Sequence, residues 1–261
     1  MKSLRSQYSQ HFLINRQLVA HLVRQASLGP NDTVVEIGPG RGIITRELLK
    51  VCHTVIAIEI DPSLSRNLAT QLINRQNLTL CTTDFLRFPL PVTPYKVFAN
   101  LPFAIEGEII RRLLESDNPP DDMHLVVIRD VGFRWVGHRK ESYFSLSYKP
   151  WFEMKVTHQF RRTDFTPKPK VDSIVITISK RPTPMLKITQ KKSYEQFLTQ
   201  AFSGGRRIDT NLRPFFSKNQ LNHLSRTFNF PFNARPTDLS FHQWLQLFKE
   251  QNWCSGATSK R

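Results

Sequence analysis

Four consecutive residues, Asn100-Leu101-Pro102-Phe103, bring together the groups that would hold an exocyclic amine of a nucleobase for attack on an electrophile. The Asn100 side-chain oxygen and the Leu101 carbonyl are two acceptors, and Pro102 fixes the turn that makes them converge. Both N–H bonds of the amine would be held, which leaves its lone pair facing the electrophile. Phe103 offers a ring on which an extruded base stacks, worth about 1–3 kcal/mol. We predict a catalytic role for all four residues; the alternative is that Asn100 caps a helix and Phe103 fills a core.

A glycine-rich string, Gly38-Pro39-Gly40-Arg41-Gly42, follows the strand-like run 34–37. The run predicts a short buried strand, and the apolar spacing over 43–50 predicts a helix directly after the glycines. Glycines let a ligand approach the backbone closely, and the start of a helix offers unpaired N–H groups. The pattern is typical of a nucleotide-type cofactor site at the first strand–helix turn of an α/β sheet, although a simple tight turn would also use it.

The spacing of these glycines indicates which cofactor is bound. A dinucleotide fingerprint reads G-x-G-x-x-G and places a pyrophosphate on the helix N-terminus, whereas this string reads G-x-G-x-G. Glu36 would repel a pyrophosphate, but it suits a ligand that carries an ammonium and a sulfonium group. S-adenosylmethionine (SAM) is such a ligand, and E-x-G-x-G-x-G resembles motif I of class I methyltransferases. We therefore predict a SAM site that includes Glu36, Gly38 and Gly40.

Further acids are expected at the ends of the next two strands. Glu59 follows Gly38 by about 20 positions, the spacing of an acid that hydrogen-bonds a ribose hydroxyl. Asp84 ends the third strand, where its oxygen would accept from the adenine amine, and Phe85 would pack against the purine. Carboxyl ends of parallel strands share one edge of a sheet, so we assign Glu59, Ile60, Asp84 and Phe85 to the cofactor site together with Asn100.

The order of elements predicts the fold class. Regular alternation of strands and helices up to about residue 180 predicts an α/β fold with a mostly parallel sheet and helices on both faces. A linker at 181–184 precedes a region dominated by helical patterns. We predict a class I SAM-dependent methyltransferase Rossmann-like sheet with a small C-terminal helical domain, as domains 1–181 and 182–261. The expected strands are 34–37, 54–60, 78–83, 95–101, 124–128, 155–160 and 173–179.

The charge of the chain indicates a polyanionic partner. There are 37 Lys and Arg residues against 21 Asp and Glu residues, for a formal net charge of +16. Such a positive charge favours binding to a nucleic-acid backbone, because each neutralised phosphate releases counterions. Basic pairs at 111–112, 161–162, 191–192 and 206–207, with Lys168 and Lys170, would form the RNA-binding surface, part of it in the C-terminal domain. Taken singly, each pair is also compatible with an ordinary solvated surface.

Other classes of protein are disfavoured. No apolar run approaches the ~20 residues of a membrane span, and the segment 1–5 lacks an apolar signal region, so we expect a cytoplasmic protein without membrane contact. Three widely spaced cysteines form no C-x-x-C pair, which indicates a reducing compartment. The histidines and cysteines show no zinc spacing, and we assign no metal.

Taken in order, these motifs resemble the rRNA adenine N6-methyltransferase family, which holds the KsgA-type 16S rRNA dimethylases and the Erm 23S rRNA methyltransferases of erythromycin resistance. The resemblance covers about residues 5–180 and implies SAM-dependent N6-methylation of an adenine in rRNA. It also implies that Gln10, His11, Phe12 and Leu13 contribute to the SAM pocket.

Two features favour the Erm branch. The KsgA type usually continues the catalytic tetrad as N-L-P-Y-N-I-S, whereas Phe103 is followed here by Ala104-Ile105-Glu106-Gly107. Segments 150–153 and 165–173 resemble a subgroup of Erm sequences. The resemblance thus implies mono- or dimethylation of 23S rRNA, protein-free or in early assembly, by a monomer, with macrolide, lincosamide and streptogramin B resistance as the consequence. A KsgA-type 16S rRNA dimethyltransferase, or a catalytically silent RNA-binding factor, are the alternatives.

Overall fold

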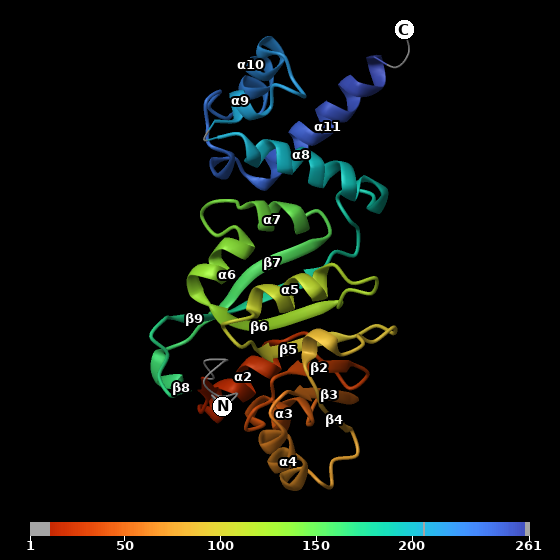
Figure 1. Cartoon of the computed structure of the whole chain (residues 1–261), viewed down its shortest axis with the longest axis vertical. Coiled ribbons are helices and arrows are strands. Elements are labelled where there is room, and N and C mark those ends of the chain that lie inside the picture. The colour runs from red at the N-terminus through yellow and green to blue at the C-terminus, as the bar shows by residue number, and fades with distance from the viewer. Residues whose placement is uncertain (1–10, 206, 259–261) are drawn as a thin grey trace. The chain divides into compact units, whose positions relative to one another are not determined.

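The structure, a computed structural model, describes residues 11–205 and 207–258. The expectations for Gln10 and Arg206 fall outside these ranges. The chain divides into two compact units (Figure 1), of which the first comprises 1–132 and 155–180, and the second 133–154 and 181–261. We call them the sheet unit and the helical unit.

A seven-stranded sheet organises the sheet unit, with strand order β4-β3-β2-β5-β6-β9-β7. Its strands are β2 (Thr33–Ile37), β3 (Thr54–Glu59), β4 (Leu78–Thr82), β5 (Lys96–Asn100), β6 (Asp122–Ile128), β7 (Phe152–Gln159) and β9 (Ser173–Lys180). The pairs from β4 to β6 are all parallel, and β9 is antiparallel to β6. The predicted α/β class and mostly parallel sheet are confirmed.

Helix α2 (Arg16–Gln25) precedes the parallel strands, and α3 (Ile43–Leu48), α4 (Pro62–Gln71) and α5 (Glu106–Leu114) follow β2, β3 and β5, as their sequence signals predict. Helix α6 (Arg129–Val136), after β6, was not predicted. The Asn15 side chain caps α2 by accepting from the backbone N–H of Leu18, and Asp61 caps α4, which has Pro62 at its first position. The apolar faces of α2 and α3 pack in one core cluster with Val34, Phe98 and other strand residues. This packing fixes the sheet edge from which the glycine loop emerges.

A two-stranded sheet, absent from the sequence-based prediction, joins the N-terminal segment to a distant loop. Strand β1 (Phe12–Leu13) pairs antiparallel with β8 (Phe165–Thr166). The pairing continues where the Ile14 N–H donates to the Asp164 carbonyl at 2.9 Å. Two strands of two residues each carry no periodicity, so only the folded chain reveals them.

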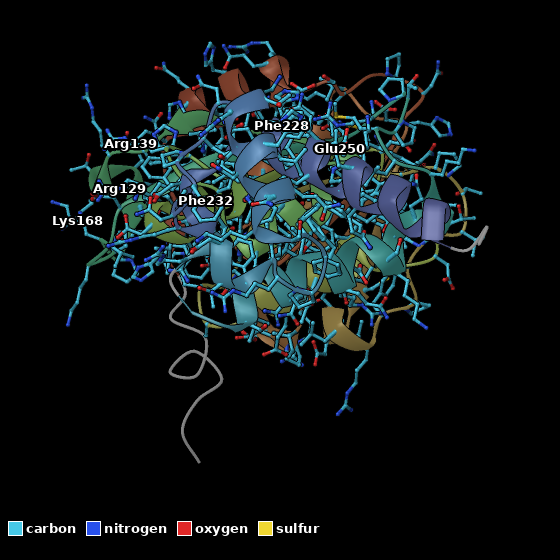
Figure 2. The ribbon with its side chains drawn as sticks, turned by 90° about the horizontal axis from the view of Figure 1, so that it is seen from above. Arg129, Arg139, Lys168, Phe228, Phe232 and Glu250 are labelled. Atoms are coloured by element: carbon cyan, nitrogen blue, oxygen red, sulfur yellow. The ribbon has the colours of Figure 1, made fainter. Side chains whose placement is uncertain are left out.

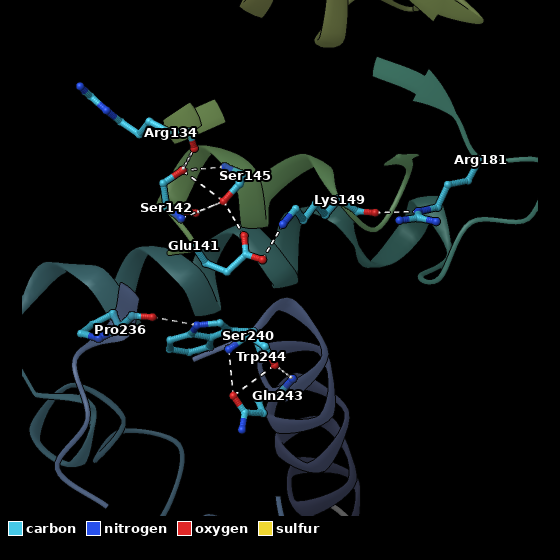
Figure 3. A network of polar contacts seen from close by, with 10 residues as sticks. All are labelled: Arg134, Glu141, Ser142, Ser145, Lys149, Arg181, Pro236, Ser240, Gln243 and Trp244. Carbon is cyan, nitrogen blue, oxygen red and sulfur yellow. Dashed lines mark hydrogen bonds and ion pairs between the residues drawn. The ribbon is translucent and has the colours of Figure 1, made fainter. Parts of the chain in front are cut away.

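The helical unit contains α7 (Tyr143–Tyr148), α8 (Lys191–Ser203), α9 (Ile208–Asn211), α10 (Lys218–Thr227) and α11 (Phe241–Thr258). Residues 133–154 lie in this unit, although the sequence places them in the catalytic domain. Arg181 joins the two parts of this unit by donating to the Lys149 carbonyl at 2.9 Å (Figure 3). Within the segment, Glu141 accepts from Ser145 and Lys149. The Trp244 indole donates to the Pro236 carbonyl at 3.0 Å in the same unit.

Among the helices that the structure describes, none is long and apolar enough to cross a membrane.

Candidate active site

A pocket that is partly open to solvent lies at the carboxyl edge of β2, β3, β4 and β5. Most of the sequence-predicted site residues meet here. The predicted residues that line it are His11, Phe12, Gly38, Gly40, Glu59, Ile60, Asp84, Phe85, Asn100, Leu101, Pro102 and Phe103.

Two predicted residues do not line this pocket. Leu13 is 4% exposed and packs in the core cluster of the sheet unit. Glu36 is 1% exposed and lies within β2, one residue short of the strand end. Sequence reasoning also missed five lining residues, Ile37, Ile58, Thr83, Ile105 and Ile109. The only available signal was position: Ile37, Ile58 and Thr83 adjoin predicted site residues, and Ile105 and Ile109 follow the tetrad within six residues.

The glycine loop has the backbone conformation that only glycine adopts easily. Gly38 has φ +67° and Gly40 has φ +55°, both in the left-handed region. A Cβ atom on Gly38 would meet no protein atom within 4 Å, so this position opens toward the pocket. At Gly40, in contrast, a Cβ atom would lie 2.8 Å from Cε1 of Phe12. Gly40 is therefore required for the close approach of β1 to the loop.

Glu59 connects the glycine loop to the start of α4. One carboxylate oxygen accepts from the Gly40 N–H at 3.0 Å and the other from the Asp61 N–H at 2.9 Å. Burial raises the pKa of Glu59, and these backbone hydrogen bonds oppose that rise. Each carboxylate oxygen has a second lone pair, so Glu59 retains capacity for a ribose hydroxyl.

The environment of the Glu36 carboxyl group differs from the one expected for a charged ligand of the cofactor. Neither carboxylate oxygen makes a hydrogen bond of normal geometry among the described residues, although Thr45 lies beside it. Burial raises the pKa of Glu36 to about 8, against a smaller lowering by the Thr45 hydroxyl and N–H. The side chain is therefore mostly protonated at neutral pH and presents little charge to a ligand. Its role in cofactor binding stays a prediction.

Asp84 and Phe85 lie side by side on the pocket wall. One Asp84 oxygen, Oδ1, accepts from the Leu86 N–H at 2.9 Å and so caps the short helix η1 (Phe85–Arg87). The other oxygen makes no hydrogen bond to a described residue. Phe85 is 5% exposed, and the Arg112 guanidinium lies 5.8 Å from its ring centroid. The Phe85 ring is thereby fixed as a flat apolar wall.

Asn100 is held in one orientation by the N-terminal segment. Its Nδ2 donates to the backbone carbonyl of His11 at 2.8 Å. A carbonyl only accepts, so the amide nitrogen must face His11 and the oxygen must point the other way. The Asn100 Oδ1 atom is buried without a hydrogen-bond partner among the described residues, and Asn100 lines the pocket. A buried acceptor without a hydrogen bond lowers the stability of the folded protein unless a ligand donates to it.

The rings of His11 and Phe103 lie against each other, with centroids 5.5 Å apart at 35°. The His11 Nδ1 atom is 2.8 Å from the Pro167 carbonyl, so the ring also ties the N-terminal segment to the loop after β8. Phe103 is half-buried. Its remaining exposed surface is available for an incoming base.

Glu106 is a buried carboxylate that sequence reasoning did not single out. It is 4% exposed and accepts from the Ile128 N–H at 3.2 Å, so it joins α5 to the end of β6. Burial raises its pKa to about 7. A glutamate four positions after the tetrad's proline was visible in the sequence, but its burial was not.

A basic loop lies beyond the pocket in the sheet unit. Arg129 and Arg162 both form ion pairs with Asp172, the second at 2.7 Å. These ion pairs anchor the segment that follows β8. Lys168 and Lys170 lie in this segment and are exposed. Figure 2 shows the Lys168 side chain directed outward into solvent. The arrangement leaves cations available to a phosphate backbone.

The pocket fits SAM in its donor and acceptor set. Glu59 would provide acceptors for ribose hydroxyls, the second Asp84 oxygen would accept from the adenine amine, and Phe85 would form an apolar wall. The opening at Gly38 leaves room for a ligand next to the backbone. Asn100 lines the same pocket, and its assignment to the cofactor site and to catalysis stays a prediction.

Comparison with known proteins identifies the family. A family model described as Ribosomal RNA adenine dimethylase matches residues 1–252. The chain belongs to this family. The resemblance that the motifs predict is therefore confirmed, and the chain is a methyltransferase enzyme.

Individual relatives of the dimethylase family cover nearly the whole chain. A ribosomal RNA small subunit methyltransferase A of a Nostoc species is 31% identical over 261 residues, with 93% of this chain and 96% of that protein covered. An rRNA adenine N-6-methyltransferase of Bacteroides fragilis is 30% identical over 243 residues, with 92% and 91% covered. The crystal structure of the 23S rRNA methyltransferase ErmE has TM-score 0.87 at 27% identity, covering 92% of this chain and 99% of that one. Membership in the dimethylase family implies SAM as methyl donor and ribosomal RNA as substrate.

Proposed function

We propose that the chain methylates the N6 amino group of one adenine in 23S rRNA, with SAM as methyl donor. The observation that carries the proposal is the Asn100 side chain. Its nitrogen is occupied by the His11 carbonyl, and its oxygen is a buried acceptor with no protein partner in the described residues. An N–H of an adenine amine is the group that this oxygen lacks.

The residues of the tetrad would activate the adenine amine by holding it in the orientation that methyl transfer requires. When bound, SAM supplies an electrophilic methyl group on its sulfonium. Asn100 Oδ1 accepts one N6–H and the Leu101 carbonyl accepts the other, which orients the nitrogen lone pair toward the methyl carbon. Pro102 fixes the turn, and Phe103 stacks the extruded base. Formation of the C–N bond would break the methyl–sulfur bond and leave the thioether, and the N6 proton would then pass to solvent, so no strong general base is required before transfer.

Two observations support 23S rRNA over 16S rRNA. The structure matches that of the 23S rRNA methyltransferase ErmE over 99% of its chain. In addition, Ala104 follows the tetrad where KsgA-type enzymes usually have an asparagine. Macrolide, lincosamide and streptogramin B resistance would be the consequence of this modification.

A specific finding also favours the alternative, a 16S rRNA adenine dimethyltransferase of small-subunit maturation. The Nostoc relative, named a small subunit methyltransferase, is as similar in sequence as the Bacteroides fragilis one. Overall sequence identity therefore does not discriminate between the two substrates.

The deciding experiment is incubation with methyl-labelled SAM and separate, protein-free 16S and 23S transcripts. We expect label on an adenine of 23S rRNA, a poor reaction with the assembled large subunit, and increased macrolide tolerance when a sensitive bacterium expresses the chain. The Asn100→Ala variant should abolish both the label and the tolerance. Label confined to 16S rRNA, without a change in tolerance, would assign the chain to the alternative.

A further inference from the structure

The helical unit contains a pocket whose walls combine cations with apolar side chains. It lies between α9, the turn that follows it, the start of α10 and the loop after α10. No residue of the candidate active site contributes to it. Its lining residues are Arg207, Asp209, Arg213, Phe216, Ser217, Lys218, Leu221 and Phe232.

The charge of this pocket is positive. Its one carboxylate, Asp209, is occupied by Arg207, whose Nε and Nη2 donate to the two carboxylate oxygens at 2.9 Å each. Arg213 and Lys218 are exposed, and neither forms an ion pair within the described part of the chain. Lys218 is also the first residue of α10, where the partial positive charge of the helix adds to its own. Two cations are thus left for an external anion.

The apolar side of the pocket is rigid at its base and open at its rim. Phe216 is 3% exposed and Leu221 is 1% exposed. Phe232, from the loop after α10, is half-buried and visible beside the helical ribbon in Figure 2. A partly exposed ring next to unpaired cations is the combination that binds single-stranded nucleic acid, in which the backbone contacts the charge and a base contacts the ring.

Another pocket of the helical unit lacks this combination. It is lined by Tyr143, Lys192 and Glu195 with three uncharged polar residues, so it contains one cation and one acid. Of these two pockets, the one around Phe232 is better suited to an anionic and aromatic ligand.

We propose that this pocket binds one unpaired nucleotide of the rRNA substrate other than the target adenine. Arg213 and Lys218 contact the phosphate, and Phe232 stacks on the base. The inference rests on rRNA as the substrate class, but it does not depend on whether that rRNA is 16S or 23S. The helical unit would thereby add affinity and target selection that the tetrad cannot supply.

The test compares the full-length chain with Arg213→Glu/Lys218→Glu, using binding to a long rRNA transcript as a function of salt. We expect weaker binding and a salt slope lower by roughly 1.4, about 0.7 for each cation that no longer neutralises a phosphate. Arg226→Glu/Lys249→Glu is the charge-matched control, because both side chains are exposed and lie outside this pocket and outside the predicted RNA-binding pairs. The control should leave the salt slope close to that of the parent.

Phe232→Leu tests the stacking interaction separately. It should weaken RNA binding roughly fivefold to hundredfold with an unchanged salt slope, because stacking releases no counterions. Phe232→Tyr should bind like the parent. Phe228→Leu is the matched control, since Phe228 is also half-buried near the same loop but does not line the pocket.

Cofactor binding and free nucleotide define what would overturn the inference. SAM affinity by calorimetry should be equal for the parent and all pocket variants, which shows that the variants fold. Equal loss of long-RNA binding in the pocket and control variants would overturn the proposal. The proposal would also be overturned if the pocket bound free AMP while the pocket variants bound long RNA as well as the parent does. Failure of adenine methylation by the parent would instead contradict the proposed function, because the binding comparison requires no methyl transfer.

Discussion

The side-chain amide of Asn100, at the end of β5, donates a hydrogen bond to the backbone carbonyl of His11 in the N-terminal segment at 2.8 Å. His11 is in turn bound through its ring to the Pro167 carbonyl. Three segments that are distant in sequence thus fix the direction of one acceptor, Asn100 Oδ1. The first predictions concern this acceptor and the elements around it.

Removing the acceptor should affect the reaction more than binding. We expect Asn100→Ala to lower methyl transfer by roughly a hundredfold to a thousandfold, the cost of losing one preorganised hydrogen-bonding group in other active sites. SAM affinity by calorimetry and RNA affinity should remain near those of the parent. Asn118→Ala is a matched control, because Asn118 also donates to backbone carbonyls, those of Pro91 and Thr93, but lies outside the pocket. Full activity of Asn100→Ala would exclude its role as the amine acceptor.

The aromatic residue of the tetrad should be replaceable by another ring. Phe103→Tyr keeps the surface for stacking and should retain most activity, whereas Phe103→Ala should lose roughly fivefold to a hundredfold in kcat/KM. Steady-state kinetics with a protein-free transcript measure both. If Phe103→Ala matched the parent, base stacking on this ring would be the wrong mechanism.

A side chain at Gly40 should disrupt the cofactor site through Phe12. The added Cβ would lie 2.8 Å from the Phe12 ring on a backbone with φ +55°, so the N-terminal strand must move away. We expect Gly40→Val to lose SAM binding in calorimetry while circular dichroism still shows a folded protein. Gly107→Ala is the control, since its Cβ would meet nothing within 4 Å. Normal SAM affinity in a folded Gly40→Val protein would contradict the assignment of this loop.

The buried Glu36 carboxyl should make the stability of the chain depend on pH. Its pKa is raised to about 8 in the folded protein from an ordinary 4.5, so between these values the folded state holds a proton that the unfolded state has lost. The free energy of unfolding should therefore fall by about 1.4 kcal/mol per pH unit as pH rises through this window. Below the ordinary pKa both states are protonated and this contribution is constant.

The Glu36→Gln variant isolates this effect, because the amide does not titrate. Urea unfolding from pH 5 to pH 8 should show the parent losing stability relative to Glu36→Gln as pH increases. All other titrating groups contribute to both proteins and cancel in the difference. A difference that stays constant with pH would mean that Glu36 is not buried as a neutral acid.

Local sequence was sufficient for the main parallel strands and the helices that connect them, while the catalytic role of the tetrad stays a prediction. Val34 and Val35 predict a buried strand because parallel strands are covered on both faces, and Asp61-Pro62 predicts a helix start because the cap and the fixed φ angle are local properties. The carboxyl ends of parallel strands share an edge, so the order of the strands along the chain is enough to assign Gly38, Glu59, Asp84 and Asn100 to one site.

Only the tertiary structure determines which of these residues carry a charge and which of their hydrogen-bonding groups have no protein partner. Whether Glu36 carries a charge depends on desolvation by its neighbours, and the orientation of Asn100 depends on a carbonyl 89 residues away. The pairing of β1 with β8, and the gathering of Arg213, Lys218 and Phe232 around one pocket, likewise join segments whose separation along the chain carries no periodic signal. Burial and long-range hydrogen bonds are properties of the packed chain, so the sequence determined which groups are present, and the fold determined which of them are free to act.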